Sequence, residues 1–366
     1  MSTNINRRVR LVLNVVIPLL FAFVVGAIFA LVAGYNPVTV YTTIFQSGLG
    51  SVGGIMQSLG FATPLMMTGI AIAFAFKAGI WNLGVEGQLY IGAMATALIG
   101  GGYFGFSEMG LPSWLHISIA LLFGAIFGVL YACIPAALKA YLGVNEVVTT
   151  IMLNYAATYF TTYLVKCHFQ GSATYDSTEM IMRSATIQKL NVNYRVTWAV
   201  FIGIAIVLIV WFIQRKTKFG YEISAIGRQL EFSEAAGMRV KKKIFIMFMI
   251  SGAIAGIAGG TEMLGVNKQF TPNFSTNPGL GWQGYFICVL SRQHPIAVLI
   301  IAFIFGVFRY GSIALQSQVG LQLDLLNIVQ GSLIIFYSIQ YLDPAKRFRI
   351  WRHKLATADA DPAKLS

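Results

Sequence analysis

Residues 215–243 read RKTKFGYEISAIGRQLEFSEAAGMRVKKK, and they stand between two apolar runs, 196–214 and 244–264. The segment holds 11 of the 39 charged residues in a chain of 366. An apolar run of about 20 residues is long enough to cross the hydrocarbon core of a bilayer as a helix. A basic segment between two such runs is typical of a loop at the membrane surface. The stretch therefore predicts an all-α, polytopic membrane protein.

The composition of the whole chain leads to the same class. Hydrophobic residues make up 57% and charged residues 11% of the sequence, and the mean hydropathy is +0.70. A soluble domain carries about 25% charged residues, which a chain this apolar lacks. The net charge of +13 suggests nucleic acid at first. The basic residues flank the apolar runs, however, so we expect membrane lipid and no nucleic acid as the surroundings.

Windows of about 20 apolar residues predict about ten transmembrane helices, arranged as two pseudo-repeated halves. We treat residues 1–366 as one transmembrane domain with a membrane core at 11–340. The external loop is 166–195, a cytoplasmic loop spans 215–243, and a cytoplasmic tail covers 341–366. The predicted spans are 11–33, 54–76, 82–102, 116–138, 144–165, 196–214, 244–264, 279–290, 296–316 and 321–340.

The distribution of basic residues predicts the orientation of these spans. With the N-terminus in the cytoplasm, the cytoplasmic segments hold 20 of the 26 Lys and Arg residues, and the outer segments hold five. Cytoplasmic loops of membrane proteins carry such an excess. We therefore expect a multi-pass membrane protein with both termini in the cytoplasm.

Small residues recur at four-residue spacing in two of the spans. Gly252, Gly256 and Gly260 fall on one face of the seventh span, and Gly124 and Gly128 on one face of the fourth. Glycine allows helix backbones to approach closely inside a membrane. The pattern predicts a tightly packed helical bundle.

Two glycine-interrupted polar segments are candidates for a translocation pathway. The first, FKAGIWNLGVEGQLYIGA at 76–93, contains Trp81, Asn82, Glu86 and Gln88. Polar groups and broken backbone at membrane depth line a cavity or are buried in protein. The alternative is an ordinary interfacial hairpin with Lys77 and Glu86 in water.

The second segment, NPGLGWQGYFICVL at 277–290, has a similar glycine-interrupted composition and contains Trp282 and Gln283. Interrupted segments at corresponding places in two halves indicate a substrate route between repeats. Further polar residues near or within spans either line that route or make contacts inside the bundle: Asn145, Glu146, Glu262, Asn267, Arg309 and Asp324.

The sequence carries no motif for catalysis or for a metal. GxxxxGK[ST] and GxSxG are absent, so we expect neither a P-loop nucleotide site nor a nucleophile elbow. The three cysteines and four histidines are scattered without metal-ligand spacing. We predict a protein that is not an enzyme and binds no metal.

Apolar and charged residues alternate with helical spacing from about 221 to 240. This pattern predicts a short amphipathic helix that lies on the membrane or docks into a groove of another protein. Gly227 and Gly237 are the positions at which the chain is able to turn.

Residues 226–260, IGRQLEFSEAAGMRVKKKIFIMFMISGAIAGIAGG, resemble the coupling-loop region of bacterial ABC importer permeases of the branched-chain amino acid and simple sugar superfamily. The resemblance implies a location in the bacterial inner membrane. It also implies that this chain couples to an ABC ATPase subunit, which uses the ATP, and that it binds no cofactor itself. The residues implied in coupling are Gly227, Glu234, Ala235, Ala236 and Gly237.

The segment at 79–88 resembles a Gly-x-x-Asn-x-Gly-x-Glu-Gly-Gln pattern of the nucleoside-importing branch, with Gly79, Asn82, Glu86 and Gln88 in place. Sugar permeases usually have Asp-Leu-Ser-x-Gly there. The resemblance implies a nucleoside permease, a second permease subunit, homologous or identical, and an external substrate-binding protein. A permease for sugars or branched-chain amino acids stays open, as does an ion-coupled secondary carrier using Glu86, Glu262 or Asp324.

Overall fold

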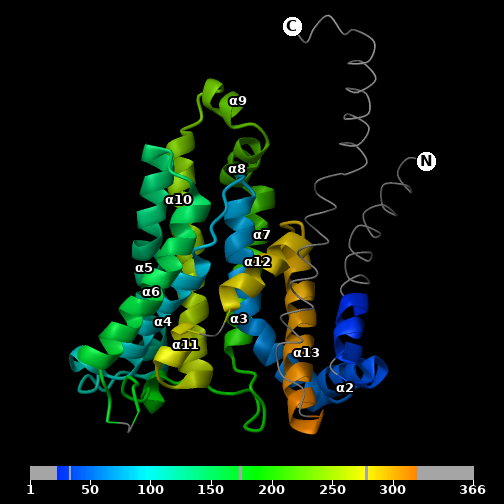
Figure 1. Ribbon diagram of the computed structural model, residues 1–366. Coiled ribbons are helices and arrows are strands. Elements are labelled where there is room, and N and C mark those ends of the chain that lie inside the picture. The colour runs from blue at the N-terminus through cyan, green and yellow to red at the C-terminus, as the bar shows by residue number, and fades with distance from the viewer. Residues whose placement is uncertain (1–22, 33, 173–174, 277–278, 320–366) are drawn as a thin grey trace, which may run out of the picture. The chain divides into compact units, whose positions relative to one another are not determined.

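The computed structural model describes residues 23–32, 34–172, 175–276 and 279–319 (Figure 1). These residues form helices and connecting loops, and their only β-type pairing is an isolated antiparallel bridge between Lys189 and Thr197. The prediction of an all-α membrane protein is confirmed. The predicted first and tenth spans and the tail at 341–366 lie mostly or entirely outside the described residues, as does Asp324.

The chain forms two units, residues 1–44 with 312–366, and residues 45–311. In the first unit the described part includes a helix at Phe23–Val32 and most of α2 (Pro37–Leu49). The Tyr41 hydroxyl donates a hydrogen bond of 2.6 Å to the Phe23 carbonyl. Every candidate site residue that is described lies in the second unit.

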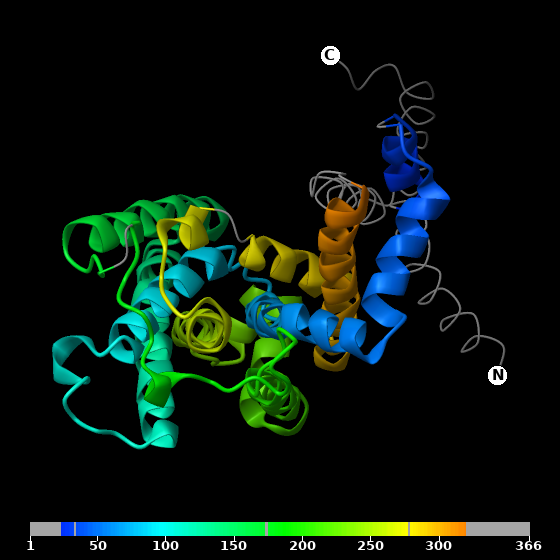
Figure 2. The same ribbon diagram turned by 90° about the horizontal axis from the view of Figure 1, so that it is seen from below.

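The second unit is a bundle of long helices with several short ones between them (Figures 1 and 2). Its helices are α3 (Val52–Phe76), α4 (Val85–Gly100), α5 (Ser113–Leu142), α6 (Glu146–Cys167), α7 (Ala199–Lys216), α8 (Lys218–Arg228), α9 (Leu230–Ala235), α10 (Val240–Glu262), α11 (Pro272–Thr276), α12 (Leu280–Leu290) and most of α13 (Pro295–Val319), with single turns η1 (Tyr103–Gly105), η2 (Arg183–Ala185) and the π-turn η3 (Met263–Asn267).

Five helices of the described residues are long and apolar enough to cross a membrane, and a bent pair at 23–32 and 37–49 adds a sixth at most. The five are α3, α5, α7, α10 with η3, and α13 through Ser317. Three other predicted spans correspond to helices that are shorter or more polar: α4 with 16 residues, α6 with 22 and α12 with 11. The predicted count of about ten spans stays a prediction.

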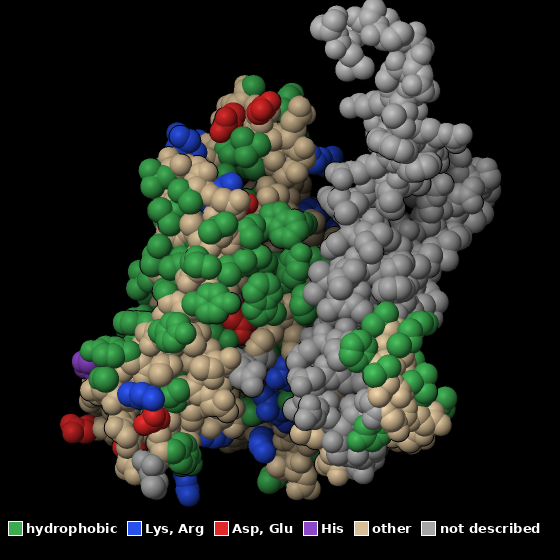
Figure 3. Space-filling view, in the orientation of Figure 1, with side chains coloured by type: hydrophobic (Ala, Val, Ile, Leu, Met, Phe, Trp, Pro, Cys, Tyr) green, Lys and Arg blue, Asp and Glu red, His purple; other side chains and the backbone are tan. Residues whose placement is uncertain are grey.

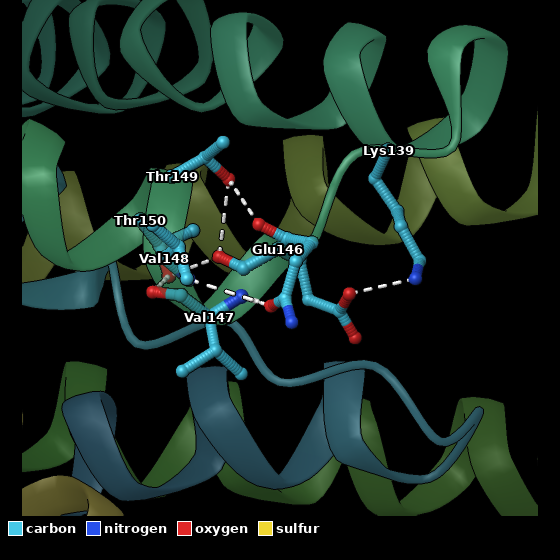
Figure 4. A network of polar contacts seen from close by, with 7 residues as sticks. Lys139, Glu146, Val147, Val148, Thr149 and Thr150 are labelled. Atoms are coloured by element: carbon cyan, nitrogen blue, oxygen red, sulfur yellow. Dashed lines mark hydrogen bonds and ion pairs between the residues drawn. The ribbon is translucent and has the colours of Figure 1, made fainter.

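Contacts at the helix ends indicate that successive helices alternate in direction. At one end of the unit, Gly227 of α8 lies against Lys77 at the end of α3, and the rings of Tyr141 and Phe245 are 6.1 Å apart. The turn between α5 and α6 lies at this end too, where Lys139 and Glu146 form an ion pair of 2.7 Å (Figure 4).

The opposite end of the unit is closed by the predicted external loop, 166–195. Its backbone amides at Met182 and Ile187 donate to the carbonyls of Gly100 and Leu264, at the ends of α4 and of the α10–η3 span. Ala185 and Ile187 are buried there in an apolar cluster. The loop therefore packs onto the bundle through its own backbone and apolar side chains.

The glycine faces seen in the sequence pack against each other. A Cβ placed on Gly256 of α10 would lie 2.1 Å from the carbonyl oxygen of Gly124 in α5, and one on Gly128 would lie 2.3 Å from that of Gly252. Such distances leave room for hydrogen only. The prediction of a close glycine-mediated helix contact is confirmed, and it fixes α10 against α5.

The surface of this unit matches residence in a membrane. On the face in Figure 3, hydrophobic side chains form a belt across the middle, and most charged side chains gather toward the two ends. Large apolar residues exposed to the outside include Leu122, Ile126, Leu130, Phe160 and Phe201. Such residues are stable outside only in contact with lipid or with another protein.

Candidate coupling loop and polar junction

The segment 217–239 forms two short helices, so the prediction of one helix from about 221 to 240 is wrong. The break lies at Gln229, where φ is −157° and ψ is 99°. An extended residue at that point ends α8 and lets α9 turn away. The expected turn at Gly237 is present, with φ of +79°, whereas Gly227 lies inside α8.

α8 is an amphipathic helix fixed to the bundle by its apolar face. Ile223 and Ile226 are buried, and the ring of Phe219 stacks on Phe74 of α3 at 6.4 Å. Glu222 forms an ion pair with Lys243 of α10. The helix is therefore attached to α3 and to α10.

Gly227 lies in direct backbone contact with the loop that follows α3. A Cβ at Gly227 would meet the carbonyl oxygen of Lys77 at 2.2 Å and the Cα of Ala78 at 2.9 Å. Only glycine permits this approach. Gly227 thus joins α8 to the loop at 77–84, a contact that is internal to this chain.

The other predicted coupling residues lie on the outside of the bundle end. Glu234, Ala235, Ala236 and Gly237 are all exposed. α9, which carries two of them, projects beyond α8 in Figure 1. A Cβ on Gly237 would meet nothing within 4 Å, so its glycine is explained by the positive φ and not by crowding.

Asn82 is the centre of a buried hydrogen-bond network in the loop at 77–84. Its amide and that of Gln88 exchange two hydrogen bonds of 3.1 Å. Asn82 also donates to the Ser251 hydroxyl of α10 at 2.8 Å and accepts from the Gly84 amide at 3.2 Å. The network connects the α3–α4 loop with α4 and α10.

Glu86 is buried and holds the start of α12. One carboxylate oxygen accepts hydrogen bonds from the backbone amides of Gly281 and Trp282, the latter at 3.1 Å, and the other accepts from the Tyr90 hydroxyl. A negative group at a helix N-terminus is favoured by the free amides and the helix dipole. The alternative of an interfacial hairpin with Glu86 in water is therefore wrong.

Two arginines extend this polar region from Glu86 toward the other end of the bundle. Arg309 of α13 donates to the Gln283 side chain of α12 at 3.1 Å. Arg195 forms an ion pair of 2.6 Å with Glu262 of α10. Both guanidinium groups face the ring of Phe61, at 4.4 Å for Arg195 and 5.9 Å for Arg309.

The two tryptophans among the candidates differ in surroundings. Trp81 is partly buried, with its ring 4.5 Å from Phe76 and 5.9 Å from Tyr285. Trp282, in the first turn of α12, has 41% of its surface exposed. Trp282 is therefore the most solvent-accessible of the candidate pathway residues.

The structure brings together the two glycine-interrupted segments that the sequence singled out, through Glu86 and the start of α12. We name this assembly the polar junction: Asn82, Glu86, Gln88, Gln283 and Arg309. Glu262 is paired with Arg195, which shares the Phe61 ring with Arg309 of the junction.

Sequence reasoning missed several partners in these networks. The sequence patterns did not single out Ser251, Arg195 or Asn154. The side-chain oxygen of Asn154 accepts a hydrogen bond of 2.8 Å from the Gly87 backbone amide. Polar residues within apolar spans are the available signal for Ser251 and Asn154. Among the described residues, no group of three His, Cys, Asp or Glu side chains is arranged to hold a metal.

Comparison with known proteins identifies relatives that cover nearly the whole chain. A nucleoside ABC transporter permease protein from Lactococcus lactis is 31% identical, over 92% of this chain and 93% of the relative. A guanosine ABC transporter permease protein from Bacillus subtilis is 29% identical, over 89% and 92%. A glucose ABC transporter permease protein from Haloferax volcanii is 27% identical, over 88% and 85%.

No solved structure matches the chain at a significant level. The model of one protein family, described as branched-chain amino acid transport system / permease component, matches residues 54–338. That range contains both the coupling loop and the polar junction. The chain is therefore a member of the branched-chain amino acid transport system / permease component family, and so a multi-pass transport component of a membrane.

Proposed function

We propose that this chain is the permease subunit of an ATP-driven nucleoside importer of the bacterial inner membrane, with both termini in the cytoplasm. An ATPase subunit would dock on α9 and the turn at 235–237. An external binding protein would deliver the cargo at the end closed by 166–195. The observation that carries the proposal is the direct contact of Gly227 in the coupling loop with the loop at 77–84, which supplies Asn82 to the polar junction, inside a chain of the permease family.

The first step of energy coupling is a push on α8. An ATPase that closes on α9 would move α8 together with it, because only Gln229 separates the two helices. Gly227 touches the backbone of Lys77 and Ala78 without an intervening side chain. Displacement of α8 along this contact therefore shifts the loop at 77–84.

The second step carries the shift to the centre of the bundle. Asn82 is bonded to Gln88 in α4 and Ser251 in α10, so the loop does not move independently of these helices. Glu86, two residues before Gln88 in α4, holds the start of α12. Movement of α4 would pull or release α12 and change access to Trp282. This is rigid-body rocking of packed helices, with α12 as the gate.

A nucleoside is the cargo that the observations favour. Two of the relatives reported above are named for nucleosides or guanosine, and the 79–88 pattern resembles the nucleoside branch. Trp282 offers an exposed aromatic face for stacking of a base. Glucose, for which the archaeal relative is named, is the second candidate.

A second permease subunit would cover the outer face of α6. Tyr155, Tyr159 and Tyr163 occupy successive turns of that helix, and each is more than half exposed. Their hydroxyls have no hydrogen-bond partner among the described residues. Three hydroxyls in lipid hydrocarbon are costly, whereas a polar helix of a neighbouring permease would satisfy them.

Uptake by a strain deleted for this gene tests the cargo. Labelled guanosine, uridine, glucose and leucine would be supplied to the deletion strain and to the same strain carrying the gene on a plasmid. We expect nucleoside uptake to fall in the deletion strain and to return with the plasmid. Nucleoside uptake equal to wild type in the deletion strain, with reduced glucose or leucine uptake, would overturn the nucleoside assignment.

The energy source is tested in the same cells. An ATP-driven importer loses uptake when ATP is depleted at constant ion gradient. A secondary carrier loses uptake when an uncoupler removes the gradient at constant ATP, and that result would refute the coupling to an ATPase.

A further inference from the structure

A cavity of about 530 Å³ lies between α8, the turn after α9 and the first turns of α10. This volume falls within the range of about 300–1,000 Å³ that is usual for small-molecule sites. Ala236 and Gly237 form one side of it, and Ile246 supplies an apolar part. The cavity therefore adjoins the coupling turn but is distinct from the polar junction.

The charge of this cavity is strongly positive. Lys218, Arg239, Lys242 and Lys243 line it, together with one carboxylate, Glu222. That carboxylate is already paired with Lys243. No ion pair joins the other three cations to a carboxylate among the described residues. Three cations around one cavity attract an anion placed between them, and such an anion offsets their mutual repulsion.

The position of the cavity along the membrane normal suggests what that anion is. The α7 span ends at Lys216, and the α10 span begins at Val240. Lys218 follows the end of α7 by two residues, and Lys242 and Ile246 lie in the first two turns of α10. Residues within a turn or two of span ends lie at the level of the lipid headgroups.

We infer that this cavity binds the phosphate headgroup of an anionic phospholipid, with Arg239 and Lys242 holding the phosphate and Ile246 contacting the apolar part below it. Arginine binds phosphate through two parallel N–H donors, and basic pockets between transmembrane helices suit anionic headgroups. The bound lipid braces the turn at 236–237 against α10. This inference does not depend on the cargo.

The test measures lipid binding to the full chain, purified in a neutral detergent, by native mass spectrometry. The probes are phosphatidylglycerol, phosphatidylcholine and inorganic phosphate. The double variant Arg239→Gln/Lys242→Gln removes two cations of the cavity. Each cation near an anionic surface strengthens binding by about fivefold, so we expect a loss of about 25-fold in phosphatidylglycerol affinity.

The matched control is Lys216→Gln/Lys241→Gln, which removes two exposed cations at the same level that do not line the cavity. It is expected to change the affinity less than threefold. An equal loss in both variants would overturn the inference, since it would indicate a diffuse surface effect. Phosphatidylcholine binding as tightly as phosphatidylglycerol would overturn it as well.

Inorganic phosphate that competes fully with phosphatidylglycerol at equal concentration would assign the cavity to a soluble anion and also refute the inference. Thermal unfolding without added lipid checks the fold of the double variant. The midpoint is expected to stay at or above that of wild type, because the variant relieves repulsion between cations. Should the double variant unfold, Arg239→Gln alone is measured, with an expected loss of about fivefold.

Discussion

At the scale of single residues, Gly227 is the position in the coupling loop where the size of the side chain decides a backbone contact. In Gly227→Ala the added methyl would lie 2.2 Å from the Lys77 carbonyl oxygen, so α8 must move away from the loop at 77–84. Overpacking of this kind costs about 1–3 kcal/mol. We expect a lower thermal midpoint and severely reduced transport.

The control for Gly227 is Gly203→Ala in α7, where the nearest atom to the new Cβ is 3.5 Å away. Alanine is favoured over glycine inside a helix by about 1 kcal/mol, so this variant is expected to be neutral or stabilised. Equal transport by Gly227→Ala and wild type would contradict the coupling route through this contact.

Lys268, just beyond the α10–η3 span, gives a pH-dependent prediction. Burial, aided by the neighbouring Lys189 ammonium, lowers the pKa of Lys268 from 10.5 to about 8. Between these two pH values the unfolded chain carries the proton and the folded chain does not. The contribution of Lys268 to stability is therefore fully present above about pH 10.5 and is lost as the pH falls through about 8.

Thermal unfolding in detergent across this window checks the Lys268 prediction. Relative to wild type, Lys268→Met is expected to be more stable at pH 7.5, and the difference is expected to shrink toward pH 10.5. Lys216→Met, at an exposed position, should keep the wild-type slope. A difference between Lys268→Met and wild type that does not change with pH would count against the lowered pKa.

At the scale of elements, α12 depends on Glu86 for the position of its first turn. Glu86→Leu would leave the amides of Gly281 and Trp282 and the Tyr90 hydroxyl without their acceptor. A buried donor without a partner costs about 1–3 kcal/mol. We expect α12 to loosen, with faster amide hydrogen exchange over 280–290 and loss of transport.

The Glu86→Gln variant separates this structural effect from a role for the charge. Glutamine keeps a carbonyl oxygen for the α12 amides, so exchange over 280–290 is expected to rise much less than in Glu86→Leu. If both variants keep wild-type exchange rates, Glu86 does not hold α12. If glutamine alone abolishes transport at normal exchange rates, the carboxylate charge is required, as an ion-coupled carrier would demand.

Surfaces for close helix packing were predictable where the sequence shows them locally. The spacing of Gly124 and Gly128 and that of Gly252 and Gly256 predicted a tightly packed bundle, because small residues four apart share one face. The structure adds that these two faces meet each other. The amphipathic pattern at 221–240 failed at Gln229. A polar residue such as Gln229 fits the surface of a helix and an extended linker between two helices equally well. The pattern therefore does not show where α8 ends.

At the scale of the whole molecule, charge and hydropathy predicted the alternating bundle, since each loop carries its own local signal. The networks were not predictable. Arg195 meets Glu262 across 67 residues, and Asn82 meets Ser251 across 169. The pairing of polar residues depends on how the helices pack against each other. That packing is not predictable from the residue type at single positions of one sequence. The sequence therefore identified Asn82, Glu86 and Gln88 but not their partners.

The docking of an ATPase on this bundle is the remaining prediction at this scale. Ala235 and Ala236 are exposed and lie beside the turn that ends α9. Ala235→Asp/Ala236→Asp should abolish transport and co-purification with the ATPase, because two carboxylates would lose their hydration at the contact. The thermal midpoint of the isolated chain should change little, since neither side chain packs inside it. Ala235→Ser/Ala236→Ser, nearly unchanged in size, should retain both activities. Normal co-purification of the aspartate variant would show that α9 is not part of the ATPase contact. The proposed transmission of ATPase movement through α8 and Gly227 would then be wrong.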